Sequence, residues 1–184
     1  MIIGICGAAG AGKNTVAERL CVQHKFVPLA FADPLYDAVS AITGLSVEQL
    51  QDRSRKENAL GWISCSPRRL LQTLGTDWGR NMIHPEIWVM ATMQRADAAG
   101  GDICITDVRF VNEAAAVKAR GGVVWRVVRP GSATLAGETA SHESERGIPQ
   151  EYIDDEVVNC GSILDLHAAV DAAMARLQTA TMVV

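Results

Sequence analysis

The chain opens with a short apolar run that leads directly into a glycine-rich turn, and this junction constrains the fold more than any other feature. Residues 2–6 (Ile-Ile-Gly-Ile-Cys) have the composition of a buried strand, and residues 7–15 (Gly-Ala-Ala-Gly-Ala-Gly-Lys-Asn-Thr) follow at once. In such a loop glycine permits a tight turn, backbone N–H groups can surround a polyphosphate, and Lys13 reaches the outer phosphates. The junction predicts a nucleotide phosphate site, and it disfavours a glycine turn that only caps an ordinary helix.

The residue after the lysine departs from the usual form of this loop. A Ser or Thr normally stands there and supplies a hydroxyl to magnesium, whereas this chain has Asn14 and places the hydroxyl one residue later, at Thr15. An amide oxygen can bind magnesium directly or through water. The candidate magnesium ligands are Asn14, Thr15 and Asp33, which follows the second expected strand, and the sequence leaves the choice among them open.

Composition excludes several classes of function. The 184 residues suit one domain, and the net charge of −4 argues against a broad nucleic-acid surface. The five cysteines include no C-x-x-C pair, so they predict buried apolar side chains in a reducing compartment. No apolar run approaches the roughly 18 residues of a membrane helix, and Met1 leads straight into a strand. We expect a cytoplasmic protein that binds small nucleotides, neither a nucleic acid polymer nor a membrane; a homodimer stays open.

Short β-rich runs alternate with helical stretches, which is the pattern of a parallel sheet covered on both faces. We expect a three-layer α/β fold with a five-stranded parallel sheet, in a single domain spanning residues 1–184. Ser162 and Asp165 predict a capping box at the last helix. The expected strands are 2–6, 28–32, 103–106, 123–128 and 156–159, and the expected helices are 13–24, 34–43, 46–53, 67–81, 86–99, 110–120 and 162–178.

Residues 130–147 break every periodicity and mix small residues with charges. A loop of this length inside a compact domain is usually functional, so the segment predicts a mobile lid. Arg129 stands at its entrance, and His142, Glu145 and Arg146 lie within it. An arginine above transferring phosphates would neutralise developing charge and help to exclude water.

The segment 66–81 has the features of a binding helix. Pro67 suits the first turn with Ser66 as its cap, and helical spacing divides the later side chains into two opposite arcs. One arc is apolar and is expected to be core; the other lacks the lysine and glutamate of an ordinary surface helix. Arginine binds phosphate bidentately and glutamine can contact a base, so a binding face is favoured over a solvated one. The apolar arc contains Leu70, Leu71, Leu74 and Trp78, and the polar arc contains Arg69, Gln72, Thr76 and Arg80.

A further polar group follows the strand 103–106. Asp107 stands at the carboxyl end of this strand, where parallel α/β sheets bind ligands. Such a carboxylate can hold a magnesium-bound water or accept a hydrogen bond from a sugar hydroxyl. Arg109 and Glu113 share one face of the next helix, and a simple surface ion pair is an equally good interpretation of these two residues.

Together these segments resemble the bacteriophage-type deoxynucleoside monophosphate kinases, within the larger family of P-loop nucleoside and nucleotide kinases. In this family Asp or Asn commonly follows the lysine, as Asn14 does, whereas Cys160 stands where related kinases often have Asp. The matching pieces occur in the family's order over nearly the whole chain. They are residues 7–15, 31–35 (Phe-Ala-Asp-Pro-Leu), 68–76 (Arg-Arg-Leu-Leu-Gln-Thr-Leu-Gly-Thr), 87–89, 106–113 (Thr-Asp-Val-Arg-Phe-Val-Asn-Glu), 128–131, 142–145 and 159–162.

The resemblance implies transfer of the γ-phosphate of ATP to a deoxynucleoside 5′-monophosphate, with magnesium, in the host cytoplasm if a phage encodes the protein. A helical region of about 34–99 and a lid of about 130–147 would surround the acceptor. The implied donor-binding residues are Gly10, Ala11, Gly12, Lys13, Asn14, Thr15, Asn159 and Gly161. The implied acceptor-binding residues are Arg68, Arg69, Gln72, Thr76, Trp88, Asp107, Arg109 and Glu113. The expected catalytic residues, which stabilise charge during direct in-line transfer, are Lys13, Arg69, Arg109 and Arg129.

Two other functions stay open at this stage. One is a kinase for a different phosphorylated metabolite, such as phosphomevalonate or dephospho-coenzyme A, which Gln72 and Trp88 weakly disfavour. The other is a non-enzymatic ATP-binding assembly or regulatory protein, which would leave the arginine-rich helix without a role. The sequence does not rank the bases that the acceptor carries, nor deoxyribose against ribose.

Overall fold

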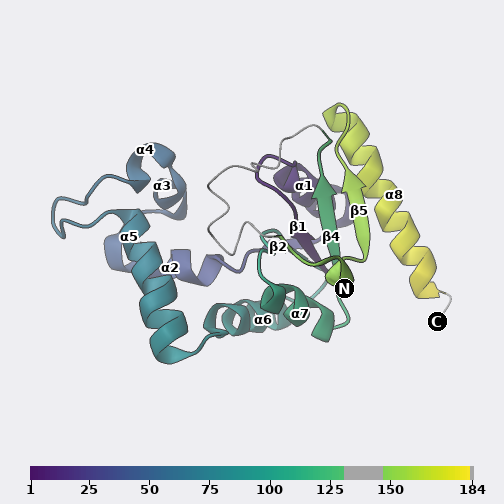
Figure 1. The fold of residues 1–184 in the computed structure, drawn as a ribbon. Helices are drawn as coiled ribbons and strands as arrows, with labels where there is room; N and C mark the ends of the chain where they lie inside the picture. The colour runs from purple at the N-terminus through teal and green to yellow at the C-terminus, as the bar shows by residue number, and fades with distance from the viewer. Residues whose placement is uncertain (131–146, 183–184) are drawn as a thin grey trace. The chain divides into compact units, whose positions relative to one another are not determined.

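The apolar opening run forms the central strand of a parallel sheet in the computed structural model of the chain (Figure 1). The structure describes residues 1–130 and 147–182. Within these residues the sheet has the order β2-β3-β1-β4-β5, and every neighbouring pair of strands is parallel, which confirms the expected five-stranded sheet. The strands are β1 (Ile2–Cys6), β2 (Val27–Leu29), β3 (Ile103–Ile105), β4 (Val123–Val128) and β5 (Asp155–Val158).

The chain divides into two compact units. Residues 1–30 and 96–184 form the sheet unit, and residues 31–95 form the helical unit. The sheet unit contains α1 (Lys13–His24), α7 (Val111–Ala119), the short 3-10 helix η3 (Gln150–Tyr152) and α8 (Ile163–Met182). The helical unit contains α2 (Asp33–Thr43), α3 (Val47–Gln51), α4 (Arg53–Lys56), α5 (Pro67–Gln72), the π-helix η1 (Thr73–Ile83) and most of α6 (Ile87–Ala99).

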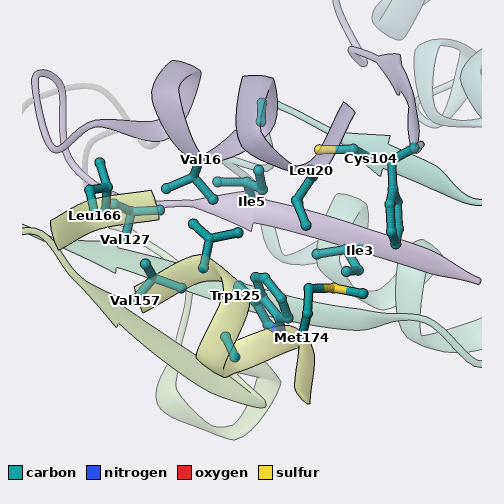
Figure 2. Close-up of a cluster of buried hydrophobic side chains, with 14 of the residues drawn as sticks. Ile3, Ile5, Val16, Leu20, Cys104, Trp125, Val127, Val157, Leu166 and Met174 are labelled. Carbon is teal, nitrogen blue, oxygen red and sulfur yellow. The ribbon is translucent and has the colours of Figure 1, made fainter. Parts of the chain in front are cut away.

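Alternation along β1 divides the core of the sheet unit between two faces. Ile3 and Ile5 are fully buried on the face covered by α1 and α8 (Figure 2). Gly4 faces the opposite side, where an added Cβ would lie 2.9 Å from Val108 and 3.2 Å from Val117 of α7. Helices therefore cover both faces of the sheet, which confirms the three-layer α/β architecture. Burial of each large apolar side chain in such a core contributes about 1.5–3 kcal/mol.

The two helices on the first face are amphipathic in the spacing of their buried residues. The buried positions of α1 are Val16, Ala17 and Leu20, and those of α8 are Leu166, Val170, Ala173 and Met174. Residues at this spacing form one stripe along a helix, and the stripe packs on the sheet. The start of α8 has the predicted capping box: the Ser162 N–H donates to Asp165 Oδ2 at 2.8 Å, and the Asp165 N–H donates to Ser162 Oγ at 3.3 Å.

A polar clamp joins α1 to α8. Arg19 donates from Nε to Asp171 Oδ1 at 3.0 Å and from Nη2 to Oδ2 at 2.6 Å, and His24 Nε2 lies 2.9 Å from the same Oδ1. The hydrogen bond from Arg19 lowers the pKa of Asp171 to about 2, with a smaller contribution from His24. The clamp therefore fixes two helices that are remote in the sequence.

The helical unit has a small core of its own. Val39 of α2, Leu50 of α3 and Leu71 of α5 are buried together. The predicted helix 46–53 is α3, which ends at Gln51, because Asp52 breaks it. Asp52 also accepts from the Ser54 N–H at 2.9 Å and so caps α4, most of which lies beyond the predicted range. Leu50 is the buried residue of α3.

The predicted helix 67–81 changes its geometry after one and a half turns. From Thr73 onward it is a π-helix, in which hydrogen bonds span five residues, as from the His84 N–H to the Gly79 carbonyl at 2.9 Å. The wider turn moves later side chains off the arcs that α-helical spacing predicts. The prediction that Trp78 belongs to the core is therefore wrong: its side chain is 43% exposed.

Three further expectations concern the cysteines, membrane helices and the lid. Cys6 and Cys104 are buried as expected, and burial raises the pKa of both thiols, whereas Cys160 is exposed. Among the helices of the described residues, none is long and apolar enough to cross a membrane. Of the predicted lid, residues 130–147, the segment 131–146 with His142, Glu145 and Arg146 lies outside the described residues.

Candidate active site

The loop between β1 and α1 depends on glycine at three positions. Gly7, Gly10 and Gly12 have φ values of 137°, 75° and 107°, which side-chain-bearing residues rarely adopt. At Gly7 an added Cβ would also lie 2.4 Å from the Val127 carbonyl oxygen of β4. The loop therefore has a backbone path that turns tightly while it lies directly against the neighbouring strand.

Lys13 begins α1 and lies across this loop. Its Nζ donates to the carbonyl oxygens of Gly7 and Ala8, each at 2.8 Å. Burial lowers the pKa of Lys13, and the positive charge of Arg109 lowers it further. The ammonium is thus held among backbone oxygens, close enough to Arg109 for the two cations to interact.

A cavity of about 400 Å³ opens beside the loop within the sheet unit. This volume lies within the usual range for small-molecule sites. Ala11, the remaining predicted donor-binding residue, is a buried residue of the loop, and its carbonyl accepts from Asn159 Nδ2 at 2.9 Å. The cavity is lined by Gly10, Gly12, Lys13, Asn14, Thr15, Arg129, Asn159, Gly161, Ile163 and Leu166.

Sheet order explains why segments so far apart in the sequence meet at this cavity. The loop follows β1, Arg129 follows β4 and Asn159 follows β5, and these three strands are parallel neighbours. Parallel strands end at one edge of the sheet, which is where α/β folds bind ligands. The Asn159 N–H extends the pairing of β5 with β4 by donating to the Val128 carbonyl at 2.7 Å.

Asp107, Arg109 and Glu113 form a second group at the end of β3. The Val108 N–H donates to the Ile5 carbonyl of β1 at 3.0 Å, so this segment also reaches the edge where the phosphate loop begins. Glu113 is 4% exposed, and its Oε2 accepts from the Arg109 N–H at 2.7 Å and the Phe110 N–H at 3.1 Å. Glu113 therefore caps α7 and holds the backbone that carries Arg109.

The predicted acceptor residues of the helical unit lie on α5 and η1, and one lies on α6. Four of them are exposed: Arg68, Arg69, Gln72 and Thr76. Arg68 pairs with Glu57, while Arg69 forms no ion pair with any residue that the structure describes. Trp88 differs from these four because it is 8% exposed, and its indole N–H donates to the Gly75 carbonyl at 2.8 Å.

The predicted magnesium ligands are distributed over both units. Asn14 and Thr15 line the cavity, and Asp33 lies in the first turn of α2. In the described part of the chain, no three His, Cys, Asp or Glu side chains gather into a metal-binding group. Magnesium commonly keeps several waters and is bound by one or two protein oxygens together with substrate phosphates. An amide oxygen and a hydroxyl beside the phosphate loop fit that mode of binding.

The sequence of the chain matches one enzyme family. The profile of the deoxynucleotide monophosphate kinases matches residues 42–170. A candidate deoxynucleotide monophosphate kinase of Acanthamoeba polyphaga mimivirus is 33% identical, over 92% of this chain and 94% of its own length. The chain belongs to the deoxynucleotide monophosphate kinase family. A deoxynucleoside-5′-monophosphate kinase of Escherichia phage T5 is 26% identical, over 86% of this chain and 89% of its own length.

Solved structures with the same fold have lower sequence identity to this member of the deoxynucleotide monophosphate kinase family. A dephospho-CoA kinase from Campylobacter jejuni has a TM-score of 0.55 at 15% identity, with 98% of each chain covered. A protein from Thermus thermophilus has a TM-score of 0.53 at 22% identity, with 96% of this chain and 97% of the other covered. These likenesses show the fold alone, so the activity rests on the family: the chain is a phosphotransferase, with ATP as its phosphoryl donor.

Two residues of the cavity were not predicted from the sequence. Ile163 and Leu166 line it from the first turn of α8, next to Asn159 and Gly161. Their spacing of three residues puts them on one face of that helix, which is a signal that the sequence does contain. Buried carbonyls such as that of Ala11 leave no comparable signal, because any residue type could supply them.

Proposed function

We propose that this enzyme transfers the γ-phosphate of ATP directly, in line, to a deoxynucleoside 5′-monophosphate. One observation carries the proposal: the phosphate loop, Arg129 and Asn159 line a single cavity in a member of the deoxynucleotide monophosphate kinase family. Lys13, the loop N–H groups and Arg129 are proposed to bind the donor phosphates. Asn159 and Gly161 are proposed to border the donor base.

The acceptor is proposed to bind through Arg68, Arg69, Gln72 and Thr76, with Asp107 and Arg109 near the transferred group. A phosphate monoester has a second pKa of about 6, so it is largely dianionic near neutral pH and needs no strong base. Catalysis then consists of positioning and charge stabilisation by Lys13, Arg69, Arg109 and Arg129. Two residues support the proposal by hydrogen bonds to the backbone. Glu113 accepts from the N–H of Arg109, and Trp88 donates to the carbonyl of Gly75, next to Thr76.

Asn14, Thr15 and Asp33 are the residues proposed to hold magnesium. When bound, magnesium would neutralise charge on the donor phosphate oxygens and so assist transfer. The oxygen chemistry of Asn14 and Thr15 beside the cavity supports this assignment.

The test measures ADP release with ATP and a panel of ribo- and deoxyribonucleoside monophosphates. We expect turnover only when a deoxynucleoside monophosphate is present, and a loss of about 100-fold or more in Lys13→Ala and Arg109→Ala. Exposed residues of the same types give matched controls, because Lys118→Ala and Arg120→Ala break only ion pairs with Asp154 and Asp97. ADP release without any acceptor would contradict the reaction, and wild-type turnover in Lys13→Ala would contradict the assigned site.

A further inference from the structure

Asn159 joins two loops of the sheet unit that are far apart in the sequence. Its Nδ2 donates to the Ala11 carbonyl at 2.9 Å, across 148 residues of chain. We propose that Asn159 is a positioning residue, which fixes the orientation of the Ala11–Gly12 peptide and so aims the Gly12 N–H at the donor phosphates. The inference rests on the proposed donor site, and it assigns to Asn159 a role that works through the loop, in addition to any contact with the base.

The geometry of the peptide group relates the hydrogen bond at Ala11 to the direction of the Gly12 N–H. In a trans peptide the C=O and the following N–H point in opposite directions, and no peptide bond of the described residues is cis. Since the Ala11 carbonyl points to Asn159, the Gly12 N–H points in the opposite direction within the peptide plane, away from Asn159. Gly12 also lines the cavity. A donor that is held in place before the ligand arrives binds an anion without reorganisation.

The space around Gly12 shows how closely the two loops fit. A Cβ added at Gly12 would lie 2.7 Å from Asn159 Nδ2 and 3.2 Å from Leu166 Cδ2. The φ of 107° at Gly12 already disfavours any other residue. The amide of Asn159 thus occupies the position that a side chain at residue 12 would need, and it supports the loop by packing as well as by its hydrogen bond.

Asn159 is itself held at a fixed place. Its backbone N–H donates to the Val128 carbonyl at 2.7 Å, directly after the paired residues Val128 and Val158. A short side chain on a backbone fixed in this way loses little conformational freedom when it forms its bond to Ala11. Arg129 follows Val128, so the same strand end positions a cation of the cavity.

The test separates a role through the loop from a contact with the base. The variant Asn159→Leu keeps the size of the side chain and removes its donor. We expect the Kd of ATP and the Kd of inorganic tripolyphosphate to rise by about the same factor, roughly tenfold, and the Kd of adenosine to rise by less than that of tripolyphosphate. Asn159→Ala removes the donor without adding bulk. Calorimetry should give the same changes in the Kd values of ATP, tripolyphosphate and adenosine for this variant.

Two other outcomes would overturn the inference. Weaker binding of adenosine with unchanged tripolyphosphate binding would overturn the inference in favour of a base contact, and unchanged binding of both probes would overturn it outright. Cys160→Ser, an exposed neighbour in the same loop, should leave all three affinities as they are. Lys13→Ala separates a failure of this inference from a failure of the proposed donor site. If Lys13→Ala also leaves tripolyphosphate binding intact, the donor site itself is wrongly placed.

Discussion

The phosphate loop of the sheet unit and the η1 helix of the helical unit both depend on glycine, but for different reasons. In the sheet unit Gly7, Gly10 and Gly12 have positive φ, so glycine is required by the path of the backbone. In η1, Gly75 and Gly79 do not have positive φ, and the atoms nearest to an added Cβ belong to side chains, 2.9 Å away in Leu35 and 2.7 Å away in Trp88. The donor loop is therefore specified by conformation, whereas the helix with the proposed acceptor residues is specified by packing, which neighbouring substitutions can adjust.

The largest effect is expected from Gly7→Ala, which tests the conformational half of this comparison. The φ of 137° and the approach of 2.4 Å to the Val127 carbonyl together cost about 3 kcal/mol. The melting temperature should fall by about 6–12 °C, and phosphoryl transfer should be lost. Differential scanning calorimetry and the ADP assay measure the two effects.

A matched control for this variant is Gly44→Ala. Gly44 has a φ of 71° with open space around it, so the substitution adds strain without a clash. We expect about 1–2 kcal/mol of destabilisation and full activity. Equal effects of the two variants would show that the contact with Val127 is unimportant.

Gly79→Ala tests the packing half of the comparison. The added methyl group collides with the Trp88 ring and with the Leu74 carbonyl, which should destabilise the protein by about 1–3 kcal/mol. Displacement of the helix should raise the KM for the acceptor about tenfold and leave the KM for ATP unchanged. Gly61→Ala, with open space and no positive φ, is the control and should behave as wild type.

A double-mutant cycle tests whether Trp88 is the residue that requires glycine at position 79. Trp88→Phe removes the ring atom nearest to Gly79, so Gly79→Ala should cost less in the Trp88→Phe background than in the wild type. Additive costs would mean that Trp88 does not specify the glycine. Unfolding in denaturant supplies the four free energies of the cycle.

Glu113→Ala is expected to have a smaller effect, on the order of 1–2 kcal/mol, because it leaves two backbone N–H groups without their acceptor. Since one of them belongs to Arg109, kcat should fall about tenfold with little change in the KM for ATP. Glu113→Gln retains an oxygen acceptor and should restore most of kcat. If Gln were as damaging as Ala, the charge of Glu113 would matter more than its capping bonds.

The smallest effect is expected at the clamp between α1 and α8. The pKa of Asp171, about 2 when folded, is lower than its unfolded value near 3.8, so the clamp is stabilising above pH 4 and its contribution is lost as the pH falls toward 2. After allowance for solvent screening, Asp171→Asn should cost about 1 kcal/mol at pH 7, or 2–4 °C in melting temperature. The difference in melting temperature from wild type should narrow between about pH 4 and pH 2. Asp97→Asn, which breaks a more exposed ion pair, is the control and should show neither effect.

The sequence predicted best where a local motif determines the geometry. The bounds of β1 and α1 agree with the structure at both ends, since the glycine turn between them permits few alternatives. The capping box of α8 was predicted because both of its partners are close in the sequence.

The sequence predicted least where geometry depends on residues remote in the chain. The change from α5 to η1 places Gly75 and Gly79 close to Leu35 and Trp88, and α-helical spacing gives no sign of it. The exposure of Trp78 and the bond from Trp88 to Gly75 both belong to this π-helical segment. The bond from Asn159 to Ala11 was beyond prediction because a backbone carbonyl has no residue identity.

The position of β1 at the centre of the sheet has a consequence for synthesis on the ribosome. Of the five strands β1 is made first, but Ile2 pairs with Ile103 and Ile3 pairs with Val123. At about 5–20 residues per second, β1 waits roughly 5–25 s for these partners. The cavity is completed later still, because Asn159 lies beyond them. ATP can therefore stabilise the sheet unit only after Asn159 has been made, and β1 stays without its neighbouring strands until residues 103–128 have been synthesised.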